Sequence, residues 1–226
     1  MLKILQISLT IKIIFGNDKH PQLNYVELEN FFPGYEFKKI WNDKTQSINR
    51  DIDLGFGGYV YAEPGMYGNV GLLDVKSMHP HSAIAMNLFG KYTERFANLV
   101  ETRVDIKEKN FDKAKARWNG KIDKYLNVIN NAKKLSTALK TAINSVYGLT
   151  SASFDNPCRD PRNENNILRG ALFMKTLQDE VEGFKVAHIK TDSIKILDAT
   201  PEIINFCMEF AKKYGYEFEH EVTECV

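Results

Sequence analysis

Two aspartates stand in sequence settings where a carboxylate is unusual and chemically useful. Asp74 lies inside an apolar segment, VGLLDV, that predicts a buried strand, and Asp192 lies in a short polar turn between two apolar segments. A charged residue inside an apolar strand is normally paired or bound to a metal ion. Two carboxylates on neighbouring strands form a hard-oxygen site that suits Mg²⁺. Taken alone, an aspartate at the end of a strand is usually a turn residue or a surface charge.

A second group of residues has the spacing of one helix face. Lys140, Asn144 and Tyr147 follow the i, i+4, i+7 rule, so we expect them on one stripe. A cation, an amide and an aromatic ring suit the phosphate, sugar and base of a nucleotide. Arg103 and Lys107 are i, i+4 neighbours on the preceding helix and are further phosphate candidates. The alternatives are an amphipathic helix with its tyrosine in the core, and two solvated cations.

Positive charge is concentrated in the middle of the chain. The 226 residues carry a formal net charge of +1, but residues 91–140 hold 13 basic and 6 acidic residues, so the remainder is acidic. A basic segment beside an acidic remainder suits a polyanion bound by the first and a metal ion bound by the second. A solvated charged helix face would give the same composition.

The composition is that of a globular protein, with 43% hydrophobic and 26% charged residues. It excludes disordered, collagen-like and fibrous coiled-coil classes. The three scattered cysteines exclude a disulfide scaffold and show no metal-ligand spacing. No uncharged apolar run is long enough to span a membrane. The apolar residues 1–15 predict a strand or a ragged boundary, with a signal peptide as the alternative.

The elements expected around the candidate residues alternate between strands and helices. Strands are expected at 57–61, at 70–75 (the end of the segment 68–76), and at 185–189, 193–197 and 216–222. Helices are expected at 80–86, 93–118, 121–147, 165–182 and 201–214, with Asn119 and Gly120 as the central break and Gly148 as a C-terminal cap. This order predicts an α+β fold in which a helical hairpin is inserted into an antiparallel sheet.

Three segments, in order, resemble the polymerase motifs of family B DNA polymerases. Residues 74–81 (DVKSMHPH) resemble the first motif, D-x-x-S-L-Y-P-S, and residues 190–193 (KTDS) resemble the third, D-T-D-S. Residues 140–148 (KTAINSVYG) match the second motif, K-x-x-x-N-S-x-Y-G, at every fixed position. Residues 57–67 are similar to the stretch that leads into the first motif. The resemblance covers about residues 54–222 and, with its short fingers, is phage-like.

The resemblance implies an antiparallel-sheet polymerase palm with an inserted fingers hairpin. Residues 1–56 would be a poorly defined segment leading into the palm, 57–92 and 151–226 the two parts of the palm, and 93–150 the fingers. The implied enzyme is a DNA-directed DNA polymerase, a nucleotidyltransferase that joins a dNTP to a primer 3′-hydroxyl by a two-metal mechanism. Its expected partners are primer-template DNA and deoxynucleoside triphosphates, and no membrane. The expected location is cytoplasmic, in the host cell if the protein is phage-encoded.

The resemblance also implies a metal site and a nucleotide site. Two Mg²⁺ ions, which Mn²⁺ can replace, would be held by Asp74, Asp192 and the backbone carbonyl of Val75. The triphosphate would be bound by three cations, Lys140, Arg103 and Lys107. The outer phosphates would lie against Ser77 and the amides of Met78 and His79. The nascent base pair would be bordered by Asn144 and Tyr147.

Two residues depart from the family pattern. His79 replaces the usual tyrosine, which stacks under the deoxyribose and excludes a 2′-hydroxyl, so the choice of sugar is open. A histidine packed at a helix start is the structural alternative. Lys190 replaces the first aspartate of the third motif and, while charged, cannot be a metal ligand. It would instead meet a phosphate, or it marks an enzyme that has lost activity.

Two polymerase parts are missing from the sequence pattern. We find no D-x-E exonuclease motif before Asp74 and no thumb after the last expected strand. The chain is therefore expected to be a core without exonuclease and thumb, with a separate chain carrying either as a candidate partner. The main alternative is a non-catalytic nucleic-acid-binding fragment or split-polymerase subunit. Another template-dependent polymerase, primase-like or RNA-making, is a second.

Overall fold

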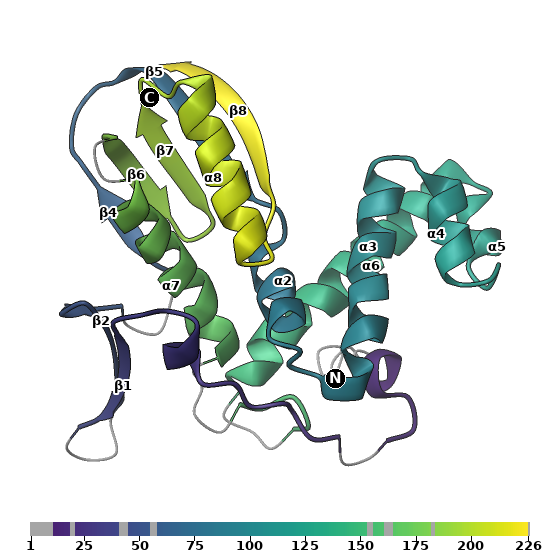
Figure 1. The fold of residues 1–226 in the computed structure, drawn as a ribbon. Helices are drawn as coiled ribbons and strands as arrows, with labels where there is room; N and C mark the ends of the chain where they lie inside the picture. The colour runs from purple at the N-terminus through teal and green to yellow at the C-terminus, as the bar shows by residue number, and fades with distance from the viewer. Residues whose placement is uncertain are drawn as a thin grey trace. The chain divides into compact units, whose positions relative to one another are not determined.

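The computed structural model describes residues 11–18, 21–40, 45–54, 58–152, 156–160, 165–181 and 184–225, with the backbone alone at 45, 165–168 and 222–225. It has the expected α+β class with antiparallel sheets (Figure 1). The elements run in the order η1 (Leu28–Asn30), β1 (Tyr35–Lys39), β2 (Thr45–Asn49), β3 (Ile52–Asp53), β4 (Val60–Ala62), β5 (Gly68–Val75), α2 (Met78–Ala85), η2 (Gly90–Tyr92), α3 (Thr93–Lys107), α4 (Phe111–Arg117), α5 (Asp123–Leu126), α6 (Ile129–Thr150), α7 (Asn165–Glu180), β6 (Val186–Lys190), β7 (Ser193–Leu197), α8 (Pro201–Lys213) and β8 (Phe218–Cys225).

The chain divides into two compact units, each made of two separate stretches. The helical unit comprises Met1–Asn24 and Met86–Pro161, and the sheet unit comprises Tyr25–Ala85 and Arg162–Val226. All the expected strands belong to the sheet unit, and the expected central helices belong to the helical unit. The expected strand start at Gly57 and the expected helix end at Glu182 lie outside the described residues.

A five-stranded antiparallel sheet forms the centre of the sheet unit, in the order β4-β6-β7-β5-β8. Side chains alternate between its two faces. Leu73 and Val75 are buried on one face, where Leu73 is paired with the equally buried Ile194. Helices α7 and α8 cover this face, as Figure 1 shows. A Cβ added at Gly71 would lie 3.2 Å from Ile204 on α8, so the sheet and helix approach closely there.

Aromatic side chains fill the space between the helices and the sheet. Phe173 on α7 lies with its ring centroid 4.5 Å from that of Tyr216 and 5.9 Å from that of Phe218. It also contacts Phe210 on α8, at 6.0 Å. Such ring pairs add to the free energy gained by burying apolar area. The aromatic cluster therefore packs α7 and α8 against β8 of the sheet.

A second, three-stranded sheet was not anticipated from the sequence. Strands β1, β2 and β3 pair in antiparallel order within residues 35–53, which are polar and mixed. Arg50 and Asp51 adopt positive φ angles of 48° and 67° at the turn from β2 to β3. The Arg50 guanidinium lies 3.0 Å from the Asp179 carboxylate on α7. This ion pair links the segment to α7 of the sheet unit.

The helical unit is built on α3 and α6, with the short helices α4 and α5 at one end of the pair (Figure 1). The single helices expected at 93–118 and 121–147 are therefore wrong in detail. The first helix ends at Lys107, and Lys109 adopts a positive φ of 63° before α4 begins. Positive φ angles at Asn119 and Gly120 do mark the expected central break.

The expected cap at Gly148 is also wrong. Helix α6 continues through Gly148 to Thr150, and Ser151 is the residue after its end. Among the described residues, and apart from the neighbouring helix backbone, no atom lies within 4 Å of where a Cβ at Gly148 would be. The glycine is therefore an exposed interior residue of the helix, where it lowers helix stability and caps nothing.

The described part of the apolar N-terminal stretch is helical, which corrects the expected strand. Residues 11–15 have helical conformation, and residues 1–10 lie outside the described residues. Ile14 and Phe15 are buried. The Phe15 ring packs edge-on against Phe89 and Tyr92, with centroids 5.7 and 5.3 Å away. This packing explains the apolar sequence. No helix in the described part of the chain has the length and apolarity needed to cross a membrane.

Candidate active site

Asp74 lies near the end of β5, between two other strands. It is paired with Ser193 on β7 and with Glu219 on β8. Residues directly opposite one another in antiparallel strands point to the same face, so these three side chains share a face. This is the face opposite to the buried Leu73, and Asp74 is half-buried on it. The strand ladder on both sides fixes the backbone of Asp74.

Asp192 lies beside it, in the turn between β6 and β7. The backbone amide of Val75 donates a hydrogen bond to the Asp192 carbonyl, at 2.7 Å. The turn consists of Thr191 and Asp192, because Lys190 and Ser193 are paired across it. The Asp192 side chain is exposed. The structure therefore brings the backbone positions of the two predicted aspartates together at one end of the sheet.

The turn that carries Asp192 is tightly restrained. Thr191 has a φ of 57°, a left-handed conformation that is strained for a β-branched residue. Its amide donates to the Tyr59 carbonyl at 3.0 Å. A Cβ at Gly58 would lie 2.5 Å from Thr191 side-chain atoms, so only glycine fits there. Backbone strain held in this way is common at functional sites.

Glu219 is a residue that sequence reasoning did not single out. It is exposed and lies directly opposite Asp74, so it adds a carboxylate to the same face. The only signal in the sequence was the acidic character of the tail, because strand register cannot be read from composition. Within the described residues, no group of three or more His, Cys, Asp or Glu side chains is arranged to hold a metal ion. A metal site here would rest on two aspartates and backbone oxygen.

Residues 77–79 lie directly after β5 and begin helix α2. Ser77 adopts a positive φ of 50°, and its carbonyl accepts the His81 amide at 3.1 Å. The Met78 side chain is buried, and a Cβ at Gly170 would lie 2.5 Å from its sulfur. The first amides of a helix have no partner within the helix, so those of Met78 and His79 suit an anion.

His79 is the predicted site residue with a shifted pKa in the sheet unit. Burial lowers the pKa of its imidazole below 6.5, and the negative charge of Asp192 acts in the opposite direction. The ring is therefore within electrostatic range of the Asp192 carboxylate. A lowered pKa keeps His79 neutral at pH 7, so the ring can pack or stack without the cost of burying a charge.

In the helical unit, the predicted row on α6 is present as a helix face. Lys140 and Asn144 are exposed and Tyr147 is half-buried. Burial raises the pKa of the Tyr147 hydroxyl, so it stays protonated at neutral pH. Ile143, one helical turn before Tyr147, and Val146 are buried on the same helix. Lys140 and Asn144 therefore lie outside the buried side of α6, whereas Tyr147 lies at its edge and partly fits the core alternative.

The two further cations lie on α3, which packs against α6. Arg103 is half-buried and Lys107 is exposed. The two residues lie one helical turn apart. Asp105, on the same helix, accepts a hydrogen bond from Arg117 at 2.8 Å. The cations of α3 and the row on α6 thus belong to one helix pair. The aspartates and residues 77–79 belong to the sheet unit.

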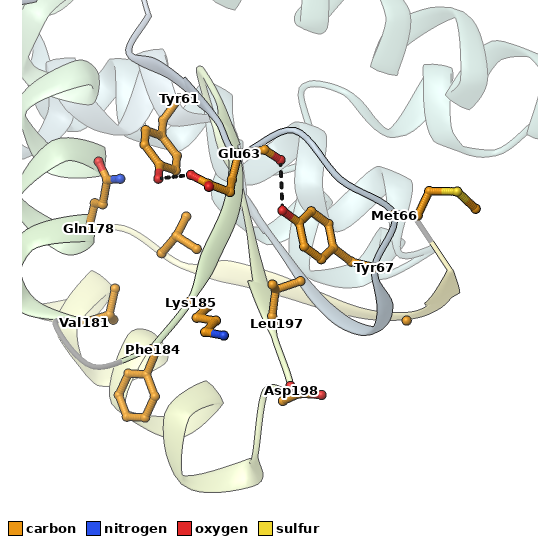
Figure 2. A pocket seen from close by; sticks show the side chains of 12 residues that line it. Tyr61, Glu63, Met66, Tyr67, Gln178, Val181, Phe184, Lys185, Leu197 and Asp198 are labelled. Carbon is orange, nitrogen blue, oxygen red and sulfur yellow. Dashed lines mark hydrogen bonds between the residues drawn. The ribbon is translucent and has the colours of Figure 1, made fainter.

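A cavity of about 750 Å³ lies at the other end of the sheet from Asp192 (Figure 2). Leu197 and Asp198, at the far end of β7, line it together with Phe184 and Val186. Figure 2 shows the Tyr61 hydroxyl directed at the Glu63 carboxylate, a bond of 3.0 Å. None of the predicted site residues lines this cavity. It is therefore separate from the carboxylate end of the sheet.

The fold of the chain is similar to folds among solved structures. The chain is similar to the family B DNA polymerase from the hyperthermophilic archaeon Pyrobaculum calidifontis, with a TM-score of 0.50 and 15% sequence identity. The matched region covers 91% of this chain and 27% of that polymerase. No protein-family model matches the sequence, and no curated protein matches it. At this identity the similarity shows the fold alone, which is family B polymerase-like.

Proposed function

We propose that the chain is the catalytic core of a DNA-directed DNA polymerase. The observation that carries the proposal is the 2.7 Å hydrogen bond from the Val75 amide to the Asp192 carbonyl, which joins the strand of Asp74 to the turn of Asp192. The two aspartates of the first and third sequence motifs thus meet at one end of a sheet. The polymerase-like fold supports this assignment.

In this proposal the sheet unit is the palm and the helical unit is the fingers. Asp74, Asp192 and the carbonyl of Val75 would hold two Mg²⁺ or Mn²⁺ ions. The donor set fits such ions, because all its atoms are hard oxygens and the Asp192 carboxylate is exposed. When bound, the ions would activate the primer 3′-hydroxyl and neutralise charge on the phosphoryl group being transferred.

The remaining predicted residues bind and orient the nucleotide. The Lys140 ammonium, with Arg103 and Lys107, binds the triphosphate as a set of positive charges. The amides that begin α2, at Met78 and His79, donate hydrogen bonds to its outer phosphates, as the start of a helix does for anions. The Ser77 hydroxyl assists them. Asn144 and Tyr147 border the base pair, where the half-buried ring supplies a flat apolar surface.

His79 would lie under the sugar of the incoming nucleotide. The ring is neutral at pH 7 because its pKa is lowered, so it can stack as a planar group. It is smaller than the tyrosine it replaces, so we expect weaker exclusion of a 2′-hydroxyl. His79→Tyr should therefore lower ribonucleotide incorporation relative to deoxynucleotide incorporation.

Lys190 motivates the second candidate function, a binding fragment without catalysis. It is exposed at the end of β6 and is paired with Ser193, beside Asp192. A lysine there can meet a primer or substrate phosphate but cannot hold a cation. A binding fragment would retain DNA affinity and show no incorporation, whatever the residue at position 192.

Primer extension separates the two candidates. The assay uses a labelled primer on a longer DNA template, with Mg²⁺ and the four dNTPs. Asp192→Asn removes the charge of the proposed metal ligand, and Asp198→Asn is its matched control at the other end of β7. We expect extension by the wild type and by Asp198→Asn, and a loss of about a thousandfold in Asp192→Asn, since a metal ion is worth several kcal/mol to the transition state.

Two outcomes would contradict the polymerase proposal. One is the absence of incorporation by the wild type under conditions where it binds primer-template DNA. The other is equal incorporation by Asp192→Asn and Asp198→Asn. The first outcome favours the binding fragment.

A further inference from the structure

At the end of the α3–α6 pair where α4 and α5 lie, the helical unit carries basic and aromatic side chains that the proposed nucleotide site does not use. Residues 109–134, here called the hairpin tip, include α4, α5 and the start of α6. They hold eight basic and two acidic residues. The proposed triphosphate ligands Arg103, Lys107 and Lys140 all lie outside this segment.

The hairpin tip packs around a small hydrophobic core that it shares with the end of α3. Ile106, Ala114, Leu126 and Ala132 are buried together at the junction of α3, α4, α5 and α6. The Trp118 indole donates to Thr102 on α3 at 2.7 Å. These contacts hold α4 and α5 against the end of the α3–α6 pair.

The lysines of the hairpin tip are available for a ligand. In the part of the chain that the structure describes, the basic residue there that forms ion pairs is Arg117, which contacts Asp105 and Glu101. Six lysines are exposed and are in no ion pair with a described residue: Lys109, Lys113, Lys121, Lys124, Lys133 and Lys134. Clustered lysines repel one another, and a bound polyanion would neutralise their charge and reduce this repulsion.

Apolar side chains are exposed among these lysines. Tyr125 is 43% exposed, Val128 52% and Ile129 80%. The Lys124 ammonium lies 4.9 Å from the centroid of the Tyr125 ring. Lys133 lies one helical turn after Ile129, on the same face of α6. One short stretch therefore exposes an aromatic ring and two aliphatic side chains together with lysines.

We infer that the hairpin tip binds single-stranded nucleic acid. Lysines bind the phosphates of a strand, and an exposed ring stacks on a base that is not already stacked in a duplex. A duplex would satisfy the lysines and leave Tyr125, Val128 and Ile129 in water. An acidic protein would also satisfy the charge, but it gives no reason for a ring placed beside a lysine. This inference does not depend on nucleotidyl transfer by the chain.

The test measures binding of a labelled single-stranded oligodeoxynucleotide to the full chain by fluorescence anisotropy, in EDTA and without dNTPs. Lys121→Gln/Lys124→Gln should weaken binding and lower the slope of log K against log salt by about 1.4, since each phosphate contact contributes about 0.7 for single strands. The control is Lys212→Gln/Lys213→Gln, another exposed lysine pair, on α8. It should leave the affinity and the slope unchanged.

A second pair of variants tests the ring. Tyr125→Ala should raise Kd about fivefold or more, because stacking on one base contributes roughly 1–3 kcal/mol to binding. The salt slope should stay unchanged, because no phosphate contact is lost. Tyr125→Phe keeps the ring and should bind as the wild type does. A duplex of the same sequence should show no difference between these two variants.

Three outcomes would overturn the inference: an unchanged salt slope in Lys121→Gln/Lys124→Gln, equal binding by Tyr125→Ala and Tyr125→Phe, or tighter binding of an acidic polyglutamate peptide than of the oligonucleotide. The last would assign the surface to a protein partner. Because no metal or dNTP is present, Asp192→Asn should bind as the wild type does. Failure of nucleotidyl transfer would therefore not mimic failure of this test.

Discussion

The sheet unit and the helical unit hold their candidate residues in different ways. In the sheet unit, Asp74 lies in a strand paired on both sides, and the Asp192 turn is bonded to both Val75 and Tyr59. In the helical unit, Lys140 and Asn144 project from an exposed face of one helix. The first arrangement fixes backbone atoms within a ladder, whereas the second leaves long side chains free to adjust.

This difference matches what each kind of ligand needs. A divalent ion requires oxygen ligands at closely defined distances, so its site must resist small shifts. A triphosphate is large and flexible, and a lysine can follow it as a point charge. We therefore expect the sheet unit to be sensitive to small changes in shape, and the helical unit to be sensitive mainly to changes in charge.

The largest effect is expected from removing a carboxylate in the sheet unit. Asp74→Asn should reduce single-nucleotide incorporation about a thousandfold, since it removes a ligand of both proposed ions. The matched control is Glu221→Gln, because Glu221 lies opposite Leu72, two pairs further along the strands and on the same face. Its rate should stay within about twofold of the wild type, as expected for an exposed charge in high dielectric. Equal losses in the two variants would contradict the assignment of Asp74.

The next effect is expected in the helical unit, on binding. Lys140→Gln should raise the dNTP KM about tenfold or more, because a hydrogen bond to a charged group is worth about 1.5–3 kcal/mol. The control is Lys213→Gln, an exposed lysine on α8, which should not change KM. Steady-state incorporation kinetics give both values. A KM for Lys140→Gln that matches the control would separate the helical unit from nucleotide binding.

A pair of glycine substitutions tests the sensitivity to shape. Gly58→Ala places a Cβ 2.5 Å from Thr191 side-chain atoms, so it should displace the Asp192 turn and lower the free energy of unfolding by roughly 1–3 kcal/mol. Gly148→Ala adds a Cβ in open space within α6 and should raise it by roughly 0.5–1 kcal/mol. Urea unfolding measures both. A Gly58→Ala protein as stable as the wild type would show that the turn is not restrained as described.

The smallest effect is expected in the titration of His79. Its pKa should lie below 6.5, and Asp192→Asn should lower it further because the aspartate opposes the effect of burial. The unfolded chain then binds the proton more readily than the folded one. The contribution of neutral His79 to the free energy of unfolding is therefore fully present above pH 6.5. It falls as the pH drops through 6.5 towards the folded pKa. NMR titration of the imidazole, with Asp198→Asn as control, measures the coupling. A pKa above 6.5 would contradict the buried position.

Sequence patterns predicted the elements that have strong local signals. The apolar runs of β5, β6 and β7 were found, and so was α8, whose start has Pro201 and a Thr200 hydroxyl that accepts the Ile203 amide at 3.4 Å. The i, i+4, i+7 row on α6 was also found, because helix geometry fixes it within one segment. Both aspartates were identified from their settings, and their roles as metal ligands stay predictions.

Other features depend on contacts between distant residues and could not be read in this way. The position of Glu219 opposite Asp74 follows from strand register, which packing of the whole sheet determines. The small sheet at residues 35–53 has no strong alternation of apolar side chains. The end of α3 depends on a positive φ at Lys109, and lysine gives no signal for that conformation. Gly148 gave a misleading signal, since glycine is tolerated in an exposed helix interior.

The central claim is that Asp74 and Asp192 act as one metal site, and Mn²⁺ binding tests it most directly. Electron paramagnetic resonance can measure the Mn²⁺ affinity of the wild type, Asp74→Asn, Asp192→Asn and the double variant. We expect each single substitution to weaken binding about tenfold or more, and the double variant to lose little beyond that, because residues that share a ligand are not additive. Unchanged affinity in either single variant, or losses that simply add, would contradict a shared site.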